Sequence, residues 1–153
     1  MNIKIICVGK IKEKYFVDAI NEYKKRLSAF CNIEEIEVKE VNTLEINKNV
    51  ESEGSNIISQ IKPSDYVISL AILGKQFDSI EFANMINNHY VYSSNPITFI
   101  IGGSDGLSKE VLDRSNLKLS FGKVTYPHQL MRVILYEQVY RAMMIINNHK
   151  YHK

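Results

Sequence analysis

This sequence of 153 residues contains no tryptophan, three prolines and only two cysteines. Cys7 and Cys31 have neither the spacing of a metal site nor that of a C-x-x-C redox motif, so we expect both thiols to be buried or idle and no metal to be bound. No apolar run reaches the roughly 18 residues of a membrane span, and the charged start MNIKIICVGKIKEKYF is untypical of a signal peptide. We therefore expect a cytoplasmic protein with no membrane partner.

The chain also lacks a strong net charge, which is only +2. The charges are unevenly placed, however. Residues 1–30 hold seven Lys or Arg against three acids, residues 34–53 hold two against seven, and residues 118–153 hold six against one. Such runs usually mark a solvated surface, but two basic ends also suit a polyanionic partner, and charge alone leaves both interpretations open.

Apolar runs alternate with segments of helical period along the whole chain. We predict strands at 3–8, 33–38, 66–72, 97–101 and 117–121, and helices at 12–29, 46–61, 79–90, 108–114 and 127–147. Strands that alternate with helices favour an α/β fold with a parallel sheet covered on both faces. No repeat, low-complexity tract or linker divides the chain, so residues 1–153 are predicted to form one domain.

The fourth predicted strand ends in a glycine-rich segment, IIGGSDGLS at 100–108. This segment lacks the Walker spacing and the G-x-G-x-x-G fingerprint, and Asp105 would repel a phosphate. A ligand here should therefore be neutral or positive. Gly103 and Gly106 are typical of a turn, and Ser104, Asp105 or Ser108 is a candidate cap for the following helix.

The last predicted helix is apolar on nearly every side. A surface helix needs only one apolar stripe of about 100°. This helix therefore indicates either a second subunit, which we favour, or deep burial within one chain. Glu137 and Arg141 are spaced to pair with each other, whereas Arg132 has no acid three or four residues away.

Six short motifs follow one another along the whole chain. They are VGKIKEKY at 8–15, GK at 74–75, FIIGGSDGL at 99–107, TYPHQLMRV at 125–133, EQVYRA at 137–142 and YHK at 151–153. In this series the chain resembles the RlmH family of small methyltransferases that act on a pseudouridine of 23S ribosomal RNA. The resemblance implies a SPOUT fold with a C-terminal trefoil knot, an exception to the rule that chains are not knotted. It also implies a homodimer that uses S-adenosylmethionine to methylate N3 of the pseudouridine on assembled ribosomes.

The resemblance also implies which residues form the site. Cofactor contacts should come from the ends of the third and fourth strands and from the segment after the fifth: Leu70, Gly102, Phe121, Gly122, Lys123, Val124, Thr125 and Tyr126. The catalytic set should be Arg141, Tyr151 and His152, with His152 handling the proton, Arg141 orienting the base and Tyr151 stacking or hydrogen bonding. His128, Arg132 and Lys153 are candidate substrate-binding residues.

Three other interpretations compete with this one. The basic ends would also serve a non-catalytic RNA-binding or ribosome-associated module. An enzyme of the same knotted fold could modify a tRNA nucleotide instead. A hydrolase built on Cys7 or Cys31 is remote, because neither thiol has a base placed beside it.

Overall fold

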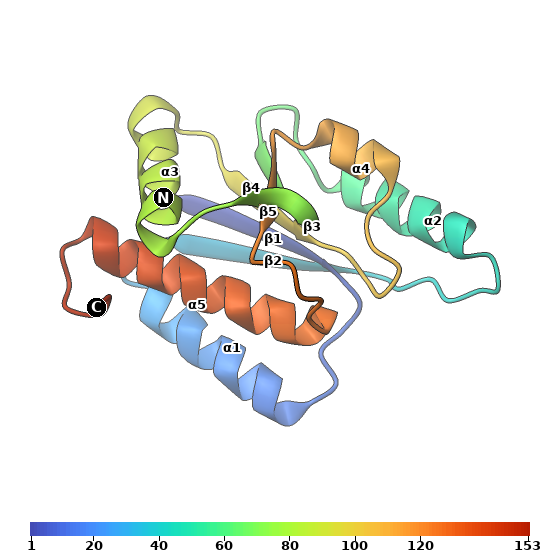
Figure 1. Cartoon of the computed structure of the whole chain (residues 1–153), viewed down its shortest axis with the longest axis horizontal. Helices are drawn as coiled ribbons and strands as arrows, with labels where there is room; N and C mark the ends of the chain where they lie inside the picture. The colour runs from blue at the N-terminus through green and yellow to red at the C-terminus, as the bar shows by residue number, and fades with distance from the viewer.

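The computed structural model describes residues 1–153 and contains one five-stranded sheet, all parallel, with helices on both faces (Figure 1). The strands are arranged in the order β2-β1-β4-β3-β5. This arrangement confirms the predicted α/β class. In chain order the elements are β1 (Asn2–Val8), α1 (Lys14–Leu27), β2 (Asn32–Val38), α2 (Ile46–Ser59), β3 (Tyr66–Gln76), α3 (Ser79–Tyr92), β4 (Ile97–Ile101), α4 (Lys109–Arg114), β5 (Leu117–Ser120) and α5 (His128–Ile146).

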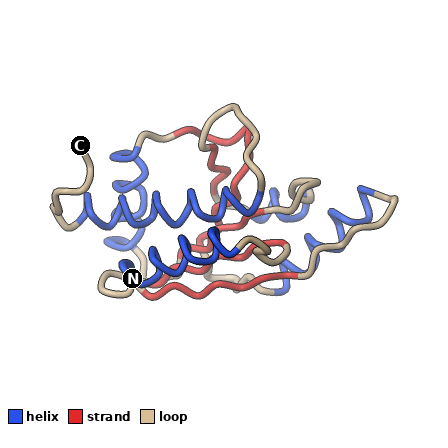
Figure 2. The backbone as a smooth tube through the Cα atoms, turned by 90° about the horizontal axis from the view of Figure 1, so that it is seen from below, coloured by secondary structure: helices blue, strands red, loops and turns tan.

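The helices divide between the two faces of the sheet. α1, α3 and α5 lie together on one face, and α2 and α4 lie together on the other (Figures 1 and 2). Each face has its own apolar cluster, and every residue of β4 between them is buried. A central strand that is covered on both faces needs apolar side chains in both directions, which explains the unbroken run ITFII. None of the helices is both long and apolar enough to cross a membrane.

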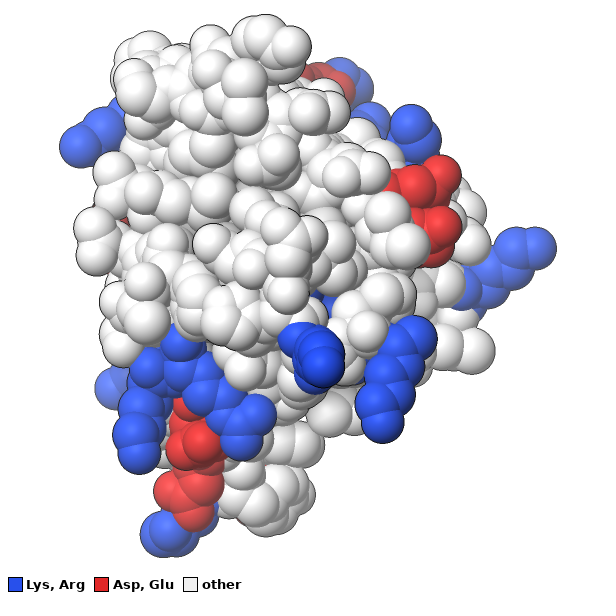
Figure 3. Space-filling model, turned by 90° about the vertical axis from the view of Figure 1, so that its left-hand side faces the viewer, with Lys and Arg blue, Asp and Glu red and all other residues white.

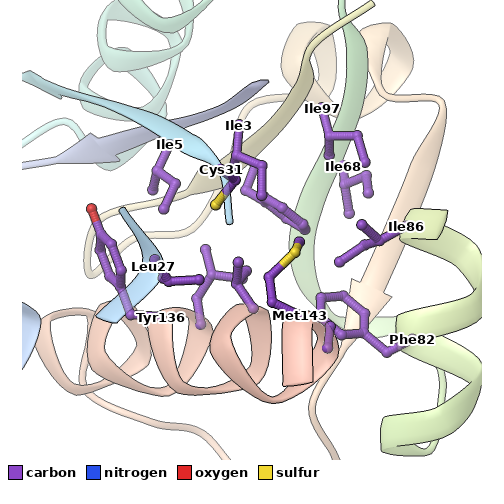
Figure 4. Packing of buried hydrophobic residues seen from close by; sticks show 14 of the residues in the cluster. Ile3, Ile5, Leu27, Cys31, Ile68, Phe82, Ile86, Ile97, Tyr136 and Met143 are labelled. Carbon is purple, nitrogen blue, oxygen red and sulfur yellow. The ribbon is translucent and has the colours of Figure 1, made fainter. Parts of the chain in front are cut away.

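α5 is seated in the larger cluster, between α1 and α3. Tyr136 and Met143 point from α5 toward the sheet, beside Leu27 of α1 and Phe82 of α3 (Figure 4). Seven of its 19 residues are buried. Contacts within one chain therefore account for much of the apolar surface of α5. The all-round apolar pattern does not by itself require a second subunit.

β3 is longer than predicted, because it resumes after an interruption. Its pairing with β5 shifts between Leu70 and Lys75, so that residues 71–74 leave the ladder as a bulge. Gly74 makes the return possible, since a Cβ atom there would lie 2.7 Å from the Lys118 carbonyl. The prediction that the strand ends at 72 was wrong because the apolar period carries no signal for a bulge that returns to the same partner.

The contact between α2 and α4 depends on a second glycine. Gly54 of α2 is buried, and a Cβ atom there would collide with Ser108, whose own Cβ would be only 2.8 Å away. Ser108 caps α4 by accepting a hydrogen bond from the Val111 amide at 3.3 Å. The two helices can approach this closely only because position 54 has no side chain.

We expect Gly54→Ala to lower the free energy of unfolding by about 1–3 kcal/mol, the usual cost of overpacking. Urea denaturation would measure this change, with the exposed neighbour Ser55→Ala as the matched control. Adding Ser108→Gly should restore most of the loss, because it removes the collision and glycine is only a few tenths of a kcal/mol worse than serine as an N-cap. Full stability of Gly54→Ala alone would contradict this account.

Candidate active site

A cavity of about 890 Å³ opens at the carboxyl ends of β3, β4 and β5. Its volume falls in the range of about 300–1,000 Å³ that is typical of small-molecule sites. In open parallel sheets, ligands bind at this edge, where the loops that follow the strands converge. The walls are the β3 bulge, the glycine-rich loop after β4, the segment after β5 and the first turn of α5. Twelve of the 22 lining residues are hydrophobic, so the cavity suits a ligand with large apolar surfaces.

The glycine-rich loop is a tight turn whose glycines have different tasks. Gly106 has φ +83°, a left-handed conformation that favours glycine, and its amide donates to the Gly103 carbonyl at 3.2 Å. Gly102 has an ordinary φ, but a Cβ atom there would lie 2.9 Å from the Gly106 carbonyl oxygen. Gly102 therefore lets its own loop fold back closely, and this fold forms one edge of the cavity.

Most of the cofactor residues named from the resemblance line this cavity. Seven of the eight do so: Leu70, Gly102, Phe121, Gly122, Val124, Thr125 and Tyr126. Lys123 is exposed and is not among the residues that line the cavity, so its assignment to the cofactor site stays a prediction. His128 lies on the rim instead, beside Met131. The bulge residues 71–73, which no sequence motif marks, also line the cavity, because β3 leaves its ladder there.

Arg132, a predicted substrate-binding residue, lies outside the cavity. It is 1% exposed, and its guanidinium donates to Glu37 at 3.2 Å and to the Gly9 carbonyl at 3.0 Å. These partners leave no surface for a substrate, so the assignment of Arg132 to substrate binding is corrected. The acid that pairs with it lies 95 residues away, which a search of its own helix could not find.

The other predicted residues gather at the far end of α5, around a carboxylate. Glu137 accepts hydrogen bonds from Arg141 at 2.8 and 3.1 Å and from the Tyr151 hydroxyl at 3.1 Å. The Arg141 guanidinium also lies over the Tyr151 ring, 4.8 Å from its centroid, and contacts His152 Nδ1 at 3.3 Å. Arg141, Tyr151 and His152 are therefore neighbours. Glu137, expected from the sequence only to pair with Arg141, binds both Arg141 and Tyr151, and Arg141 in turn contacts His152.

The contacts of this cluster restrict the protonation states. Burial and the Glu137 carboxylate raise the pKa of Tyr151, so its phenol stays protonated and acts as a donor. The hydrogen bond to Glu137 raises the pKa of Arg141. Because a guanidinium only donates, His152 Nδ1 must accept from it, and in the neutral ring the proton then lies on Nε2. His152 thus presents a donor, and to take up a proton it must first release Arg141.

The cavity and this cluster lie at opposite ends of one helix. His128 begins α5, and Arg141 follows 13 residues later. At 1.5 Å per residue the two are separated by about 20 Å. Figure 1 shows the last residues turning back beside the far end of α5, away from the loop that precedes it. One chain therefore carries two half-sites that do not meet within it.

Neither cysteine contributes to a site. Cys7 and Cys31 are buried, and burial raises the pKa of Cys7 to about 12 and that of Cys31 to about 11. Thiols with such pKa values are poor nucleophiles near neutral pH, which removes the cysteine hydrolase from consideration. No group of three His, Cys, Asp or Glu side chains is placed to hold a metal ion.

Known proteins similar to this chain agree with the geometry. Residues 1–152 match the family described as "Predicted SPOUT methyltransferase". The chain is 50% identical over 159 positions to the ribosomal RNA large subunit methyltransferase H of Carboxydothermus hydrogenoformans and 52% identical to that of Lactiplantibacillus plantarum, each alignment covering 100% of both chains. A probable methylase family protein from Haemophilus influenzae Rd KW20 has a similar fold, with a TM-score of 0.59 at 13% identity over 99% of this chain and 70% of that chain.

A parallel α/β sheet with an apolar pocket at the ends of β3, β4 and β5 defines, together with the family match, a methyltransferase of the SPOUT class. The methyl donor of this class is S-adenosylmethionine. The mainly hydrophobic cavity suits this cofactor, because neither its adenosine nor its methionine part carries a phosphate. The chain belongs to the ribosomal RNA large subunit methyltransferase H family. The resemblance seen in the sequence motifs is thereby confirmed.

We expect Gly102→Val to weaken S-adenosylmethionine binding about tenfold or more, because the added side chain must displace the Gly106 carbonyl that shapes the cavity edge. Isothermal titration calorimetry would measure the affinity, and circular dichroism would verify that the fold persists. Lys109→Ala, an exposed change just after the same loop, is the control and should bind normally. Wild-type affinity of Gly102→Val would reject the role of this loop in cofactor binding.

Proposed function

We propose that this enzyme methylates N3 of a pseudouridine in 23S ribosomal RNA on assembled ribosomes. The observation that carries the proposal is the identity of about half of all positions, over the full length of both chains, to ribosomal RNA large subunit methyltransferases H. Residues 1–153 would act as one catalytic domain in the cytoplasm, where assembled ribosomes are found. The non-catalytic alternative fails because the family is one of methyltransferases. No observation favours a tRNA target.

The chemistry makes two demands on the site. The methyl group moves in line from the sulfonium to an imide nitrogen that is a poor nucleophile while it carries its proton, so the reactants must be aligned and the proton removed. Arg141 is a donor suited to stabilising the imidate, and His152, once it has released Arg141, would accept the departing proton at Nδ1. Tyr151 offers a phenol donor and a ring for stacking the base. His128, on the rim of the cavity, would meet the substrate from the cofactor side.

The separation of the two half-sites favours a homodimer with composite sites. If two α5 helices pack in opposite directions, the Arg141, Tyr151 and His152 cluster of one protomer meets the cavity of the other. Apolar side chains around the cavities support such a contact, since Leu73 is 99% exposed and Val124 is 61% exposed on one rim. Ile80, 50% exposed, lies next to a second groove that shares Phe121 and Tyr126 with the first. The trefoil knot expected of the fold stays a prediction.

The charge distribution fits a polyanion at the cluster of α5. Figure 3 shows that the side of the molecule bearing α3 is largely uncharged in its upper part, while Lys and Arg side chains, with Asp and Glu side chains among them, gather in the lower part, where α1 and the last residues lie. Lys25, Arg26, Lys150 and Lys153 are all exposed in this region. These charges are well placed for RNA phosphates, and we assign Lys153 to substrate binding on this basis.

A mixed dimer tests the composite site. One protomer carries Gly102→Val, and the other lacks residues 151–153; with S-adenosylmethionine held well below the weakened Kd, each variant alone should be nearly inactive as a homodimer. Co-expression with two different tags would allow the mixed dimer to be purified. In this dimer one intact cavity faces the intact C-terminal residues 151–153 of the other protomer. Its methyl transfer to ribosomes should recover to about half the wild-type rate. The tail-deleted homodimer should bind S-adenosylmethionine normally in calorimetry. An inactive mixed dimer would show that each site is built within one chain.

The modest net charge predicts a strong preference for the ribosome over naked RNA. Phosphate neutralisation supplies much of the affinity for free RNA, and a net charge of +2 provides little of it, so shape must supply the rest. Transfer of a radioactive methyl group to free 23S RNA should be slower than transfer to ribosomes by about tenfold or more. Equal rates would contradict the ribosomal substrate, and methylation of a tRNA pool would favour the tRNA alternative.

A further inference from the structure

The segment that joins β1 to α1, together with the first turn of α1, contains basic and aromatic side chains that neither half-site uses. Lys10 and Lys12 are exposed, and neither forms an ion pair, whereas Lys14 pairs with Asp18. Tyr15 is 64% exposed, and its ring rests edge-on against Phe16 at a centroid distance of 4.6 Å. Unpaired lysines next to an exposed ring form the combination that holds single-stranded RNA, with phosphates on the lysines and a base on the ring.

This segment, residues 9–15, is held in place rather than frayed. Gly9 has φ +83° and donates to the Val38 carbonyl at 2.8 Å, while its own carbonyl accepts from Arg132 at 3.0 Å. The Lys12 amide donates to Gln129 Oε1 at 3.1 Å, and the Ile11 side chain packs on the main core. With Ile11 directed inward, the side chains of Lys10 and Lys12 are exposed on either side of it.

The same contacts place the segment on the rim of the cofactor cavity. Gln129 follows His128, which lines the cavity, and a Cβ atom on Gly9 would lie 3.9 Å from His128 Nε2. Figure 1 shows the β1–α1 connection passing beside the first turn of α5. Two carboxylates are near. These are Glu40 beside Gly9 and Glu13 after Lys12, and Glu37, which pairs with Arg132, and Glu53, near Gly103, lie at the same rim; none of the four forms an ion pair with Lys10 or Lys12.

We propose that residues 9–15 hold the RNA strand that flanks the target nucleotide, with Lys10 and Lys12 on its phosphates and Tyr15 stacked on a neighbouring base. The proposal rests on the RNA methyltransferase function proposed above and adds the surface that positions the substrate. A nucleotide that is extruded into the cavity must draw its own backbone across the rim, and this segment is the basic part of the rim. The cofactor needs no contact with it.

Lys10→Glu/Lys12→Glu is the central test, measured as steady-state methyl transfer to ribosomes. KM for ribosomes should rise about tenfold or more, and the slope of log(kcat/KM) against log[salt] should become shallower by about 2, one for each lost phosphate contact. S-adenosylmethionine affinity should not change. The control Lys48→Glu/Lys62→Glu makes the same charge change at two exposed lysines, Lys48 in α2 and Lys62 before the start of β3, which belong neither to the cavity nor to the Glu137 cluster. The control should leave the salt slope nearer to that of the wild type.

Tyr15 supplies an independent readout. Tyr15→Ala should raise KM for ribosomes about fivefold or more through lost stacking, and Tyr15→Phe should restore it. A wild-type KM and salt slope for the double-lysine variant, or an equal effect of the control pair, would overturn the proposal. Co-sedimentation with ribosomes is measured in parallel. If the wild type binds ribosomes but does not methylate them, the proposed function fails. The proposal for residues 9–15 is then still tested by binding alone: weaker co-sedimentation of Lys10→Glu/Lys12→Glu supports it, and unchanged co-sedimentation overturns it.

Discussion

A buried guanidinium holds the last helix to the sheet, and both half-sites depend on where that helix lies. Arg132 binds Glu37 and the Gly9 carbonyl, and one turn later the Tyr136 hydroxyl donates to Glu35 at 2.6 Å. Because the Arg132 guanidinium is itself buried, separating it from these partners would leave an uncompensated charge, so the contacts allow little rotation or sliding of α5. The first turn of α5 therefore stays on the cavity, and its last turns carry the Glu137 cluster at a set distance.

The cavity itself arises from two departures from regular structure. The β3 bulge moves residues 71–74 out of the ladder and over the pocket, and the glycine loop after β4 folds back so closely that Gly102 tolerates no side chain. Both lie at the carboxyl edge of the sheet, where parallel strands deliver their loops to one place. A cofactor without phosphate suits such a pocket, because its walls are mainly apolar and Asp105 lies in the loop.

Much of the fold and part of the site could be predicted from local pattern. The five strands and five helices follow from alternating apolar periods, and seven residues that line the cavity follow from the order of the motifs. Arg132 was misassigned because its partners come from β2, which is distant in sequence. Lys123 does not line the cavity although its neighbours Gly122 and Val124 do, a difference that the order of the motifs cannot reveal. Glu137 was undervalued, since its spacing from Arg141 explained it without reference to Tyr151.

The sequence by itself determined the α/β class, the family and the chemical types available to the site, because these depend on short-range period and on ordered motifs. Only the tertiary structure decided which polar residues are free to act. The buried Arg132 guanidinium already binds Glu37 and the Gly9 carbonyl, whereas Lys10 and Lys12 remain unpaired on the rim of the cavity. The physical reason is that a charge acquires its role from the partners that folding brings to it, and those partners lie far along the chain.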